Sequence, residues 1–337
     1  MISKRRERKD EHIENYLKTS GHNDPLFDDI YLDHNSLSDI NFDEIDTSIE
    51  FLGRKISMPL MVNAMTGGGE LSADINEDLS SICQSLNIPM AVGSQTIGLE
   101  DEEASESFTL IKEKDLVRIG NLGAERSLED FKNAAGMIDA HAIQIHLNVA
   151  QELFMPEGDK DFRGYYDNIK NLLSQLDVPI IVKETGNGLS KEVSKKLIGA
   201  GVKYLDVSGS GGTNFIEIED MRDFVSDYKE FYNWGVPTAK AIIDARSLSK
   251  DVFIIGSGGI KTAVDMAKAI IIGADMTALS GEALRYLLLG SYEACLDYLK
   301  DMNKRLKIVM ALLGVKNIAE LKKVDYKLTG RLKDLVD

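Results

Sequence analysis

The stretch 252–281 reads VFIIGSGGIKTAVDMAKAIIIGADMTALSG and contains the unit that decides the fold. A short apolar run passes into a glycine-rich turn, then into a helical pattern, and then into a second apolar run. Val264, Ala267 and Ile271 fall on one face of the intervening helix, and Thr262 is suited to cap its N-terminus. Runs this short and this continuously apolar are typical of strands that are covered on both faces. The stretch therefore predicts two parallel strands joined by a helical crossover.

The same theme recurs from residue 59 onward. After the first apolar run, Leu71, Ile75, Leu79, Ile82 and Leu86 fall on one face of a predicted helix. A five- or six-stranded Rossmann sheet would leave two of the runs unexplained, so the pattern predicts an α/β fold of the (β/α)8 TIM-barrel class. The eight runs are PLMVNAM (59–65), IPMAVGS (88–94), LVRIGNLG (116–123), AIQIHLNV (142–149), VPIIVKE (178–184), KYLDVSGS (203–210), VFIIGSGG (252–259) and ADMTALSG (274–281).

The segments outside the repeat are expected to pack on this barrel, so that residues 1–337 form a single domain. Residues 1–55 are polar and lack a strong secondary-structure signal, and SGHNDPLFDD (20–29) reads as an irregular loop. Residues 1–55 are interpreted as an N-terminal arm, residues 56–282 as the barrel core, and residues 283–337 as a C-terminal helical segment. The basic cluster Lys4, Arg5, Arg6, Arg8 and Lys9 is either a solvated arm or a source of cations for an anionic ligand.

Composition excludes several classes of function. The net charge of -16 argues against nucleic acid as a partner, because phosphate-backbone binding needs a basic surface. No apolar run approaches the roughly 18 residues of a membrane span, and the basic N-terminus is not followed by the apolar region of a secretory signal. Cys83 and Cys295 form no CxxC pair, which indicates a reducing cytoplasm and no structural zinc.

Polar and glycine residues follow all eight apolar runs, where a TIM barrel carries its active site. The loops GSGGIKT (256–262) and LSG (279–281) predict a phosphate site built from backbone N–H groups and a helix N-terminus; the alternative is a pair of tight turns. SGSGGTNF (208–215) would supply further donors to the same ligand.

Lys183 ends an apolar strand, where a lysine requires an anion or a partner carboxylate. It could form a Schiff base, a structural ion pair, or a contact to the N1–C2=O edge of a flavin, and the neighbouring phosphate site favours the flavin. HLNVAQE (146–152) places Gln151 and Glu152 at a strand end, and oxygen ligands of this kind suit a Mg²⁺ that completes its shell with substrate phosphates.

The sequence resembles type 2 isopentenyl diphosphate isomerases over nearly its whole length. The resemblance depends on the order and spacing of many motifs rather than on one of them. These are Arg8-Lys9-Asp10-Glu11-His12, Asn63-Ala64-Met65-Thr66-Gly67-Gly68, Gly93-Ser94-Gln95, Asn121-Leu122-Gly123, His146-Leu147-Asn148 with Gln151-Glu152, Pro156-Glu157-Gly158-Asp159, Val182-Lys183-Glu184, Ser208-Gly209 with Gly211-Gly212-Thr213, and Trp234-Gly235.

The resemblance implies three groups of site residues. FMN would be held by Met65, Thr66, Gly67, Ser94, Asn121, Lys183, Ser208 and Thr213, and its phosphate by Gly259, Ile260, Lys261, Ser280 and Gly281. The diphosphate of the substrate would be met by Arg8, Lys9, Ser94, Gln95, His146, Asn148 and Gln151, with Glu152 on Mg²⁺. Many members have an arginine directly after Gly-Ser-Gln; here that residue is Thr96, which cannot supply a charged fork to the diphosphate.

The resemblance also implies the reaction, the conversion of isopentenyl to dimethylallyl diphosphate in isoprenoid biosynthesis. Reduced FMN would act as acid and base, with NAD(P)H as reductant, in a cytoplasmic homo-oligomer, a tetramer or an octamer. Glu219 and Trp234 would shape or assist the site. An FMN-dependent 2-hydroxy-acid oxidase is the nearest alternative, but it would need a histidine late in the barrel, and none follows His146. A barrel that only binds or carries a phosphate ligand is a second alternative.

Overall fold

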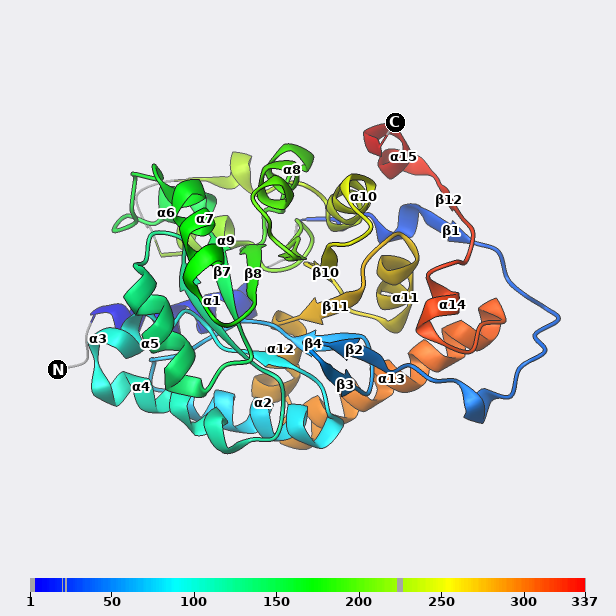
Figure 1. Ribbon diagram of the computed structural model, residues 1–337, viewed down its shortest axis with the longest axis horizontal. Coiled ribbons are helices and arrows are strands. Elements are labelled where there is room, and N and C mark those ends of the chain that lie inside the picture. The colour runs from blue at the N-terminus through cyan, green and yellow to red at the C-terminus, as the bar shows by residue number, and fades with distance from the viewer. Residues whose placement is uncertain (1–3, 20, 22, 223–226, 337) are drawn as a thin grey trace.

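The computed structural model describes residues 4–19, 21, 23–222 and 227–336. Eight strands pair in parallel into a closed barrel in the order β10-β11-β4-β5-β6-β7-β8-β9 (Figure 1). All eight predicted runs contain one of these strands, so the predicted (β/α)8 fold is confirmed. The strands are β4 (Leu60–Val62), β5 (Met90–Ala91), β6 (Arg118–Gly123), β7 (Ala142–Leu147), β8 (Ile180–Glu184), β9 (Tyr204–Asp206), β10 (Phe253–Ser257) and β11 (Met276–Leu279).

Helices cover the outside of the barrel and follow the strands in sequence. They are α2 (Ser72–Leu86), α3 (Thr96–Glu100), α4 (Glu102–Thr109), α5 (Leu128–Ile138), α6 (Val149–Phe154), α7 (Tyr165–Gln175), α8 (Lys191–Gly199), α9 (Phe215–Asp220), α10 (Thr238–Leu248), α11 (Ala263–Ile271) and α12 (Gly281–Leu289), followed by α13 (Tyr292–Leu313), α14 (Ile318–Leu321) and α15 (Gly330–Val336). None of the helices in the described part of the chain is long and apolar enough to cross a membrane.

The predicted helix faces hold in most positions. In α2, Ile75, Leu79 and Ile82 are buried, but Leu71 is 45% exposed because it precedes the first turn of the helix. In α11, Ala267 and Ile271 are buried, whereas Val264 is 45% exposed. Thr262 caps α11 as predicted, in a capping box with Asp265 that satisfies two backbone donors reciprocally.

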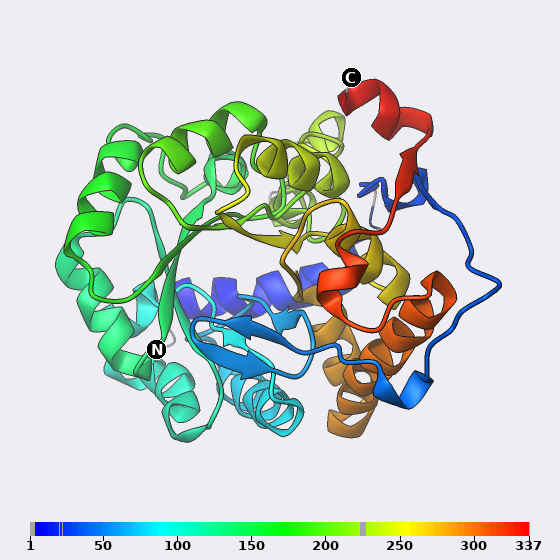
Figure 2. The same cartoon turned by 45° about the vertical axis from the view of Figure 1, so that its right-hand side comes forward.

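The N-terminal arm contains more regular structure than its sequence indicates. Residues Lys4–Lys18 form helix α1, and Figure 2 shows it running across the barrel. Ile13 of this helix is 5% exposed and belongs to the main hydrophobic core. The sequence gives no strong signal for this helix because tertiary packing stabilises it, although its sequence is almost entirely charged and polar. Residues 20 and 22 of the predicted loop 20–29 lie outside the described residues.

Two further pieces of the N-terminal segment form small sheets outside the barrel. The hairpin β2 (Ile49–Phe51) and β3 (Arg54–Ile56) places Phe51 and Ile56 in one buried cluster with inward residues of the barrel strands. The Phe51 ring lies 5.2 Å from that of Phe253, between ring centroids. Strand β1 (Ile30–Leu32) pairs antiparallel with β12 (Tyr326–Leu328), which ties the N-terminal segment to the C-terminal one. The open mouth of the barrel is consequently the one at the carboxyl ends of its strands.

Candidate active site

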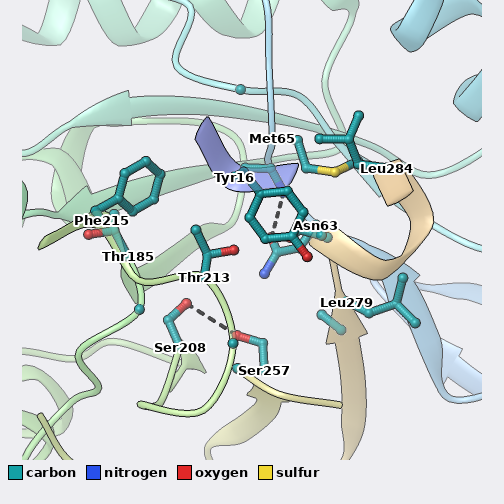
Figure 3. A pocket seen from close by; sticks show the side chains of 18 of the residues that line it. Tyr16, Asn63, Met65, Thr185, Ser208, Thr213, Phe215, Ser257, Leu279 and Leu284 are labelled. Carbon is teal, nitrogen blue, oxygen red and sulfur yellow. Dashed lines mark hydrogen bonds between the residues drawn. The ribbon is translucent and has the colours of Figure 1, made fainter. Parts of the chain in front are cut away.

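A cavity of about 520 Å³ opens at the carboxyl ends of the barrel strands. Figure 3 shows side chains from β4 onward around it, with Tyr16 of α1 lying over the middle. Most of the residues expected to hold a cofactor meet here. The predicted residues that line the cavity are Lys9, Met65, Thr66, Ser94, Asn121, His146, Gln151, Lys183, Ser208, Thr213, Gly259, Ile260, Lys261, Ser280 and Gly281.

The two glycine-rich loops are packed backbone against backbone. A Cβ on Gly258 would lie 2.0 Å from the carbonyl oxygen of Gly209, and one on Gly259 would lie 2.5 Å from that of Gly211. Both Gly258 and Gly259 also have positive φ angles, of 100° and 80°. Any side chain at these positions would be strained and would separate the loops. The loop 256–262 leads into the N-terminus of α11, and Ser280 leads into that of α12; this end of a helix favours an anion.

Lys183 is buried in the wall of the cavity, and its Nζ donates to the carbonyl oxygen of Glu184 at 2.5 Å. Burial lowers the pKa of Lys183, and the carboxylates of Asp206 and Glu184 oppose that shift. Glu184 is buried as well, and its Oε2 accepts the backbone N–H groups of Gly186 at 2.6 Å and Gly188 at 2.9 Å. Burial raises the pKa of Glu184, whereas these backbone bonds lower it. Glu184 thus shapes the loop that follows Lys183.

The remaining predicted substrate residues divide into two sets. Ser94, His146 and Gln151 line the cavity. Gln95 is fully buried behind it: its Nε2 donates to the carbonyl of Ala134 at 2.9 Å, and its Oε1 accepts the N–H of Asn121 at 3.0 Å. Both ends of the Gln95 amide are therefore engaged by backbone, which favours a supporting role over contact with substrate.

Glu152 and Asn148 lie beside the cavity rather than on its lining. Asn148 Nδ2 donates to Glu152 Oε1 at 2.7 Å, and the N–H of Asp159 donates to Glu152 Oε2 at 2.8 Å. Among residues 4–19, 21, 23–222 and 227–336, no group of three His, Cys, Asp or Glu side chains is arranged to hold a metal ion. A single carboxylate of this kind suits a Mg²⁺ that takes its other ligands from water and substrate phosphates.

Helix α1 is attached to α9 by an ionic network that sequence reasoning did not find. His12 Nε2 lies 2.8 Å from Glu219 Oε1, and Arg222 Nη1 lies 2.5 Å from Glu219 Oε2. Arg222 also meets Glu11 at 2.8 Å, and both Arg222 and Arg8 contact Glu157 Oε1, at 2.9 and 3.3 Å. Burial outweighs the Glu219 bond and lowers the pKa of His12. In the sequence, the RKDEH motif and the downstream Glu219 and Arg222 were the signal from which this network could have been predicted.

Two predicted residues do not line the cavity, and one residue that lines it was not predicted. Trp234, expected to shape the site, is 67% exposed and does not line the cavity. Gly67 supports the site from behind, since a Cβ there would lie 1.9 Å from the ring of Phe108. Tyr16 was not predicted: its hydroxyl lies so close to Gly281 that a Cβ on that glycine would be 1.9 Å away.

The comparisons with known proteins agree with this geometry. The sequence matches the FMN-dependent dehydrogenase family over residues 13–116 and 125–327. It is 40% identical over 330 residues to isopentenyl-diphosphate delta-isomerase of Geobacillus sp. (strain WCH70), covering 97% of this chain and 94% of that protein. Its identity to the enzyme of the same name from Sulfurisphaera tokodaii is 38% over 345 residues, covering 98% and 93%. The chain belongs to the isopentenyl-diphosphate delta-isomerase family.

Solved structures share the fold of this isomerase at low identity. Flavocytochrome b2 with pyruvate bound superposes with a TM-score of 0.72 at 19% identity, covering 96% of this chain and 84% of that one. Mandelate oxidase with (S)-mandelic acid superposes with a TM-score of 0.69 at 15% identity, covering 95% and 94%. At these identities the likeness concerns the barrel alone.

The cavity of the isomerase fits FMN. The paired glycine loops and the N-termini of α11 and α12 suit the phosphate, and the buried ammonium of Lys183 suits the electron-rich edge of the ring. Lys261 and Arg285 add cations to the lining. The apolar side chains of Met65, Leu279 and Leu284 are suited to pack on a planar ring (Figure 3).

Proposed function

We propose that this isomerase converts isopentenyl diphosphate to dimethylallyl diphosphate on reduced FMN bound in the cavity described above. The observation that carries the proposal is the burial of Lys183 in the wall of a cavity that two interlocked glycine loops also line, in a chain of this family. When bound, reduced FMN supplies acid–base chemistry at its ring for the allylic proton shift. No side chain of the cavity lining needs to change oxidation state.

The roles of the side chains follow from the chemistry of the substrate. Moving the double bond requires a proton at one carbon and loss of a proton two carbons away, through a state with cationic character. Such a state is short-lived in water, so the site must exclude solvent. Helix α1 does so in this proposal: Ile13 and Tyr16 line the cavity from above. Lys183 orients the ring, and Met65 and Leu284 provide apolar surface beside it.

The diphosphate is proposed to bind between α1 and the loop after β7. Lys9 and Gln151 line that side of the cavity, and Arg8, the residue before Lys9, pairs with Glu157 at 3.3 Å. A Mg²⁺ on Glu152 is proposed to join them, sharing the phosphate oxygens of the substrate. Thr96 provides no cation there, and its hydroxyl accepts a bond from Ser94 at 3.2 Å. Arg8, Lys9 and Mg²⁺ therefore carry the anion binding in this proposal.

The experiment that tests the reaction uses the holoenzyme under anaerobic conditions. The purified protein should be yellow, and reduction of its flavin by dithionite or by NAD(P)H should switch on conversion of isopentenyl diphosphate. Equal activity with oxidised flavin, or with none, would contradict the proposal. Oxidation of lactate or mandelate at a comparable rate would favour the oxidoreductase alternative. The mass of the complex in solution tests the further expectation of a tetramer or an octamer.

A further inference from the structure

Asp206 is a fully buried carboxylate beneath the floor of the cavity. It ends strand β9 and is not itself among the residues that line the cavity. Its Oδ2 accepts from Asn63 Nδ2 at 2.6 Å, and its Oδ1 accepts from Ser257 Oγ at 2.5 Å. Ser208 donates to the same Oδ1 from its backbone N–H at 3.2 Å and from its Oγ at 3.3 Å. Asn63, Ser208 and Ser257 all line the cavity, so Asp206 holds its floor from below (Figure 3).

The contacts of Asp206 bring together three different strands of the barrel. Asn63 directly follows β4, Ser208 follows β9, and Ser257 ends β10. Ser208 has a φ of 39°, a left-handed conformation that is unfavourable for a residue with a side chain. The two bonds from Ser208 to Asp206 stabilise that conformation and thereby set the course of the loop 208–213. Asn63 is fixed from its other side by Gln144, whose Nε2 donates to Asn63 Oδ1 at 2.8 Å.

Asp206 also neighbours Lys183, its partner in the register between β8 and β9. A buried ammonium tends to lose its proton unless a negative charge lies near it. The charged groups around Lys183 are Asp206 on β9 and Glu184 on its own strand, and His146 is its register partner on β7. The carboxylate of Asp206 acts more strongly on Lys183 than that of Glu184 does, and His146 adds no negative charge. Asp206 is consequently the principal counter-ion available to Lys183.

We propose that Asp206 is a positioning residue that keeps Lys183 protonated beside the flavin while it fixes Asn63, Ser208 and Ser257 in the cavity floor. The proposal rests on the placement of FMN against Lys183. An isolated carboxylate would be costly at this depth, but hydrogen bonds from three side chains and one adjacent ammonium offset that cost. In this proposal Asp206 serves Lys183 as well as the geometry of the floor.

The test is the pH at which Lys183 loses its proton in the holoenzyme. The flavin absorption spectrum is recorded as pH is raised, in the wild type and in Lys183→Arg. Because arginine stays charged, a spectral step present only in the wild type belongs to Lys183. In Asp206→Asn this step should move to lower pH by at least one unit, a tenfold change in the acid dissociation constant.

A double variant separates charge from shape. Asn63→Asp with Asp206→Asn moves the carboxylate across one hydrogen bond, and the Asn63–Asp206 contact survives with its donor and acceptor exchanged. If charge is what Lys183 needs, the double variant should return the step to within about half a unit of the wild type. If Asp206→Asn alone fails to fold or to bind FMN, the double variant decides the question. A spectral step that lies at least one pH unit below the wild-type step in the double variant would then overturn the proposal.

The outcomes distinguish this proposal from the proposed function. A wild type without any step that Lys183→Arg removes would show that Lys183 does not face the flavin, which overturns both. A Lys183 step that stays at its wild-type pH in a folded Asp206→Asn holoenzyme overturns only the role of Asp206. Equal displacement in the single and double variants would assign Asp206 to the architecture of the floor and not to the charge of Lys183, and would also overturn the proposal.

Discussion

His146 Nδ1 lies 2.7 Å from Asn121 Oδ1, between neighbouring strands of the barrel at the edge of the cavity. Burial lowers the pKa of His146 to about 3, and the positive charges of Lys183, Lys9 and Arg126 act in the same direction. The imidazole is therefore neutral at physiological pH, and it donates its Nδ1–H to Asn121. A diphosphate beside His146 meets a hydrogen-bonding group and not a cation, so the charge that binds it must come from elsewhere.

The first prediction concerns the pH dependence of stability. His146 has a lower pKa in the folded protein than in the unfolded chain, so between about pH 6.5 and 3 only the unfolded chain binds this proton. Stability is thus lost as pH falls below about 6.5. Between pH 8 and pH 5 the wild type should lose about 2 kcal/mol more unfolding free energy than His146→Gln. Urea unfolding of both proteins at the two pH values measures it, and parallel losses would contradict the burial of a neutral imidazole.

The second prediction concerns the interlocked glycine loops. Gly258→Ala should weaken FMN binding at least about tenfold, roughly 1.4 kcal/mol, because its Cβ would lie 2.0 Å from the carbonyl oxygen of Gly209 and its φ is 100°. Fluorescence titration of the apoprotein with FMN measures the dissociation constant. Gly136→Ala is the matched control, since nothing lies within 4 Å of a Cβ there and the residue sits inside helix α5. Similar FMN affinity in the two variants would remove the loops from the phosphate site.

The third prediction concerns Glu152 and Mg²⁺. Glu152→Gln removes the one charged ligand proposed for the metal but keeps the size of the side chain. The Mg²⁺ concentration needed for half-maximal activity should rise at least about tenfold, while the FMN dissociation constant stays unchanged. Glu129→Gln, which alters an exposed carboxylate on α5, should change neither quantity. Full wild-type activity in the presence of a chelator would exclude the metal.

The sequence predicted those parts of the molecule that depend on local pattern. All eight strands could be located because buried parallel strands are continuous apolar runs, and Thr262 could be recognised as a cap because it directly precedes the helical pattern of Val264, Ala267 and Ile271. Most residues expected to hold a cofactor line one cavity because a TIM barrel gathers whatever follows each strand at one mouth.

The rest depends on contacts between distant segments. Asp206 stands inside an apolar run, and its role becomes visible only when β4 and β10 bring Asn63 and Ser257 to it. Helix α1 was missed because its packing on the barrel, through Ile13, is tertiary. Gln95 was assigned to substrate through the resemblance of Gly93-Ser94-Gln95 to the family motif, but the backbone of α5 and β6 already binds both ends of its amide.

The last prediction concerns Arg8 and Lys9 on helix α1. Their removal in Arg8→Ala/Lys9→Ala should raise the Michaelis constant for the diphosphate substrate at least about tenfold, roughly 1.4 kcal/mol, since Thr96 supplies no charge to replace them.

The stability of this double variant should change little: the Arg8–Glu157 pair at 3.3 Å is partly exposed, and such pairs contribute about 0–1 kcal/mol. Lys18→Ala, which removes one positive charge from a 65% exposed lysine at the far end of the helix, is the control and should leave the Michaelis constant unaltered. Ile13→Ala separates charge from placement, because losing that buried contact should lower the unfolding free energy by about 2–4 kcal/mol and loosen α1 while both cations remain. Steady-state kinetics and thermal unfolding of the variants decide the matter, and unaltered kinetics in the double variant would make the cations of α1 solvated surface charges with no part in binding.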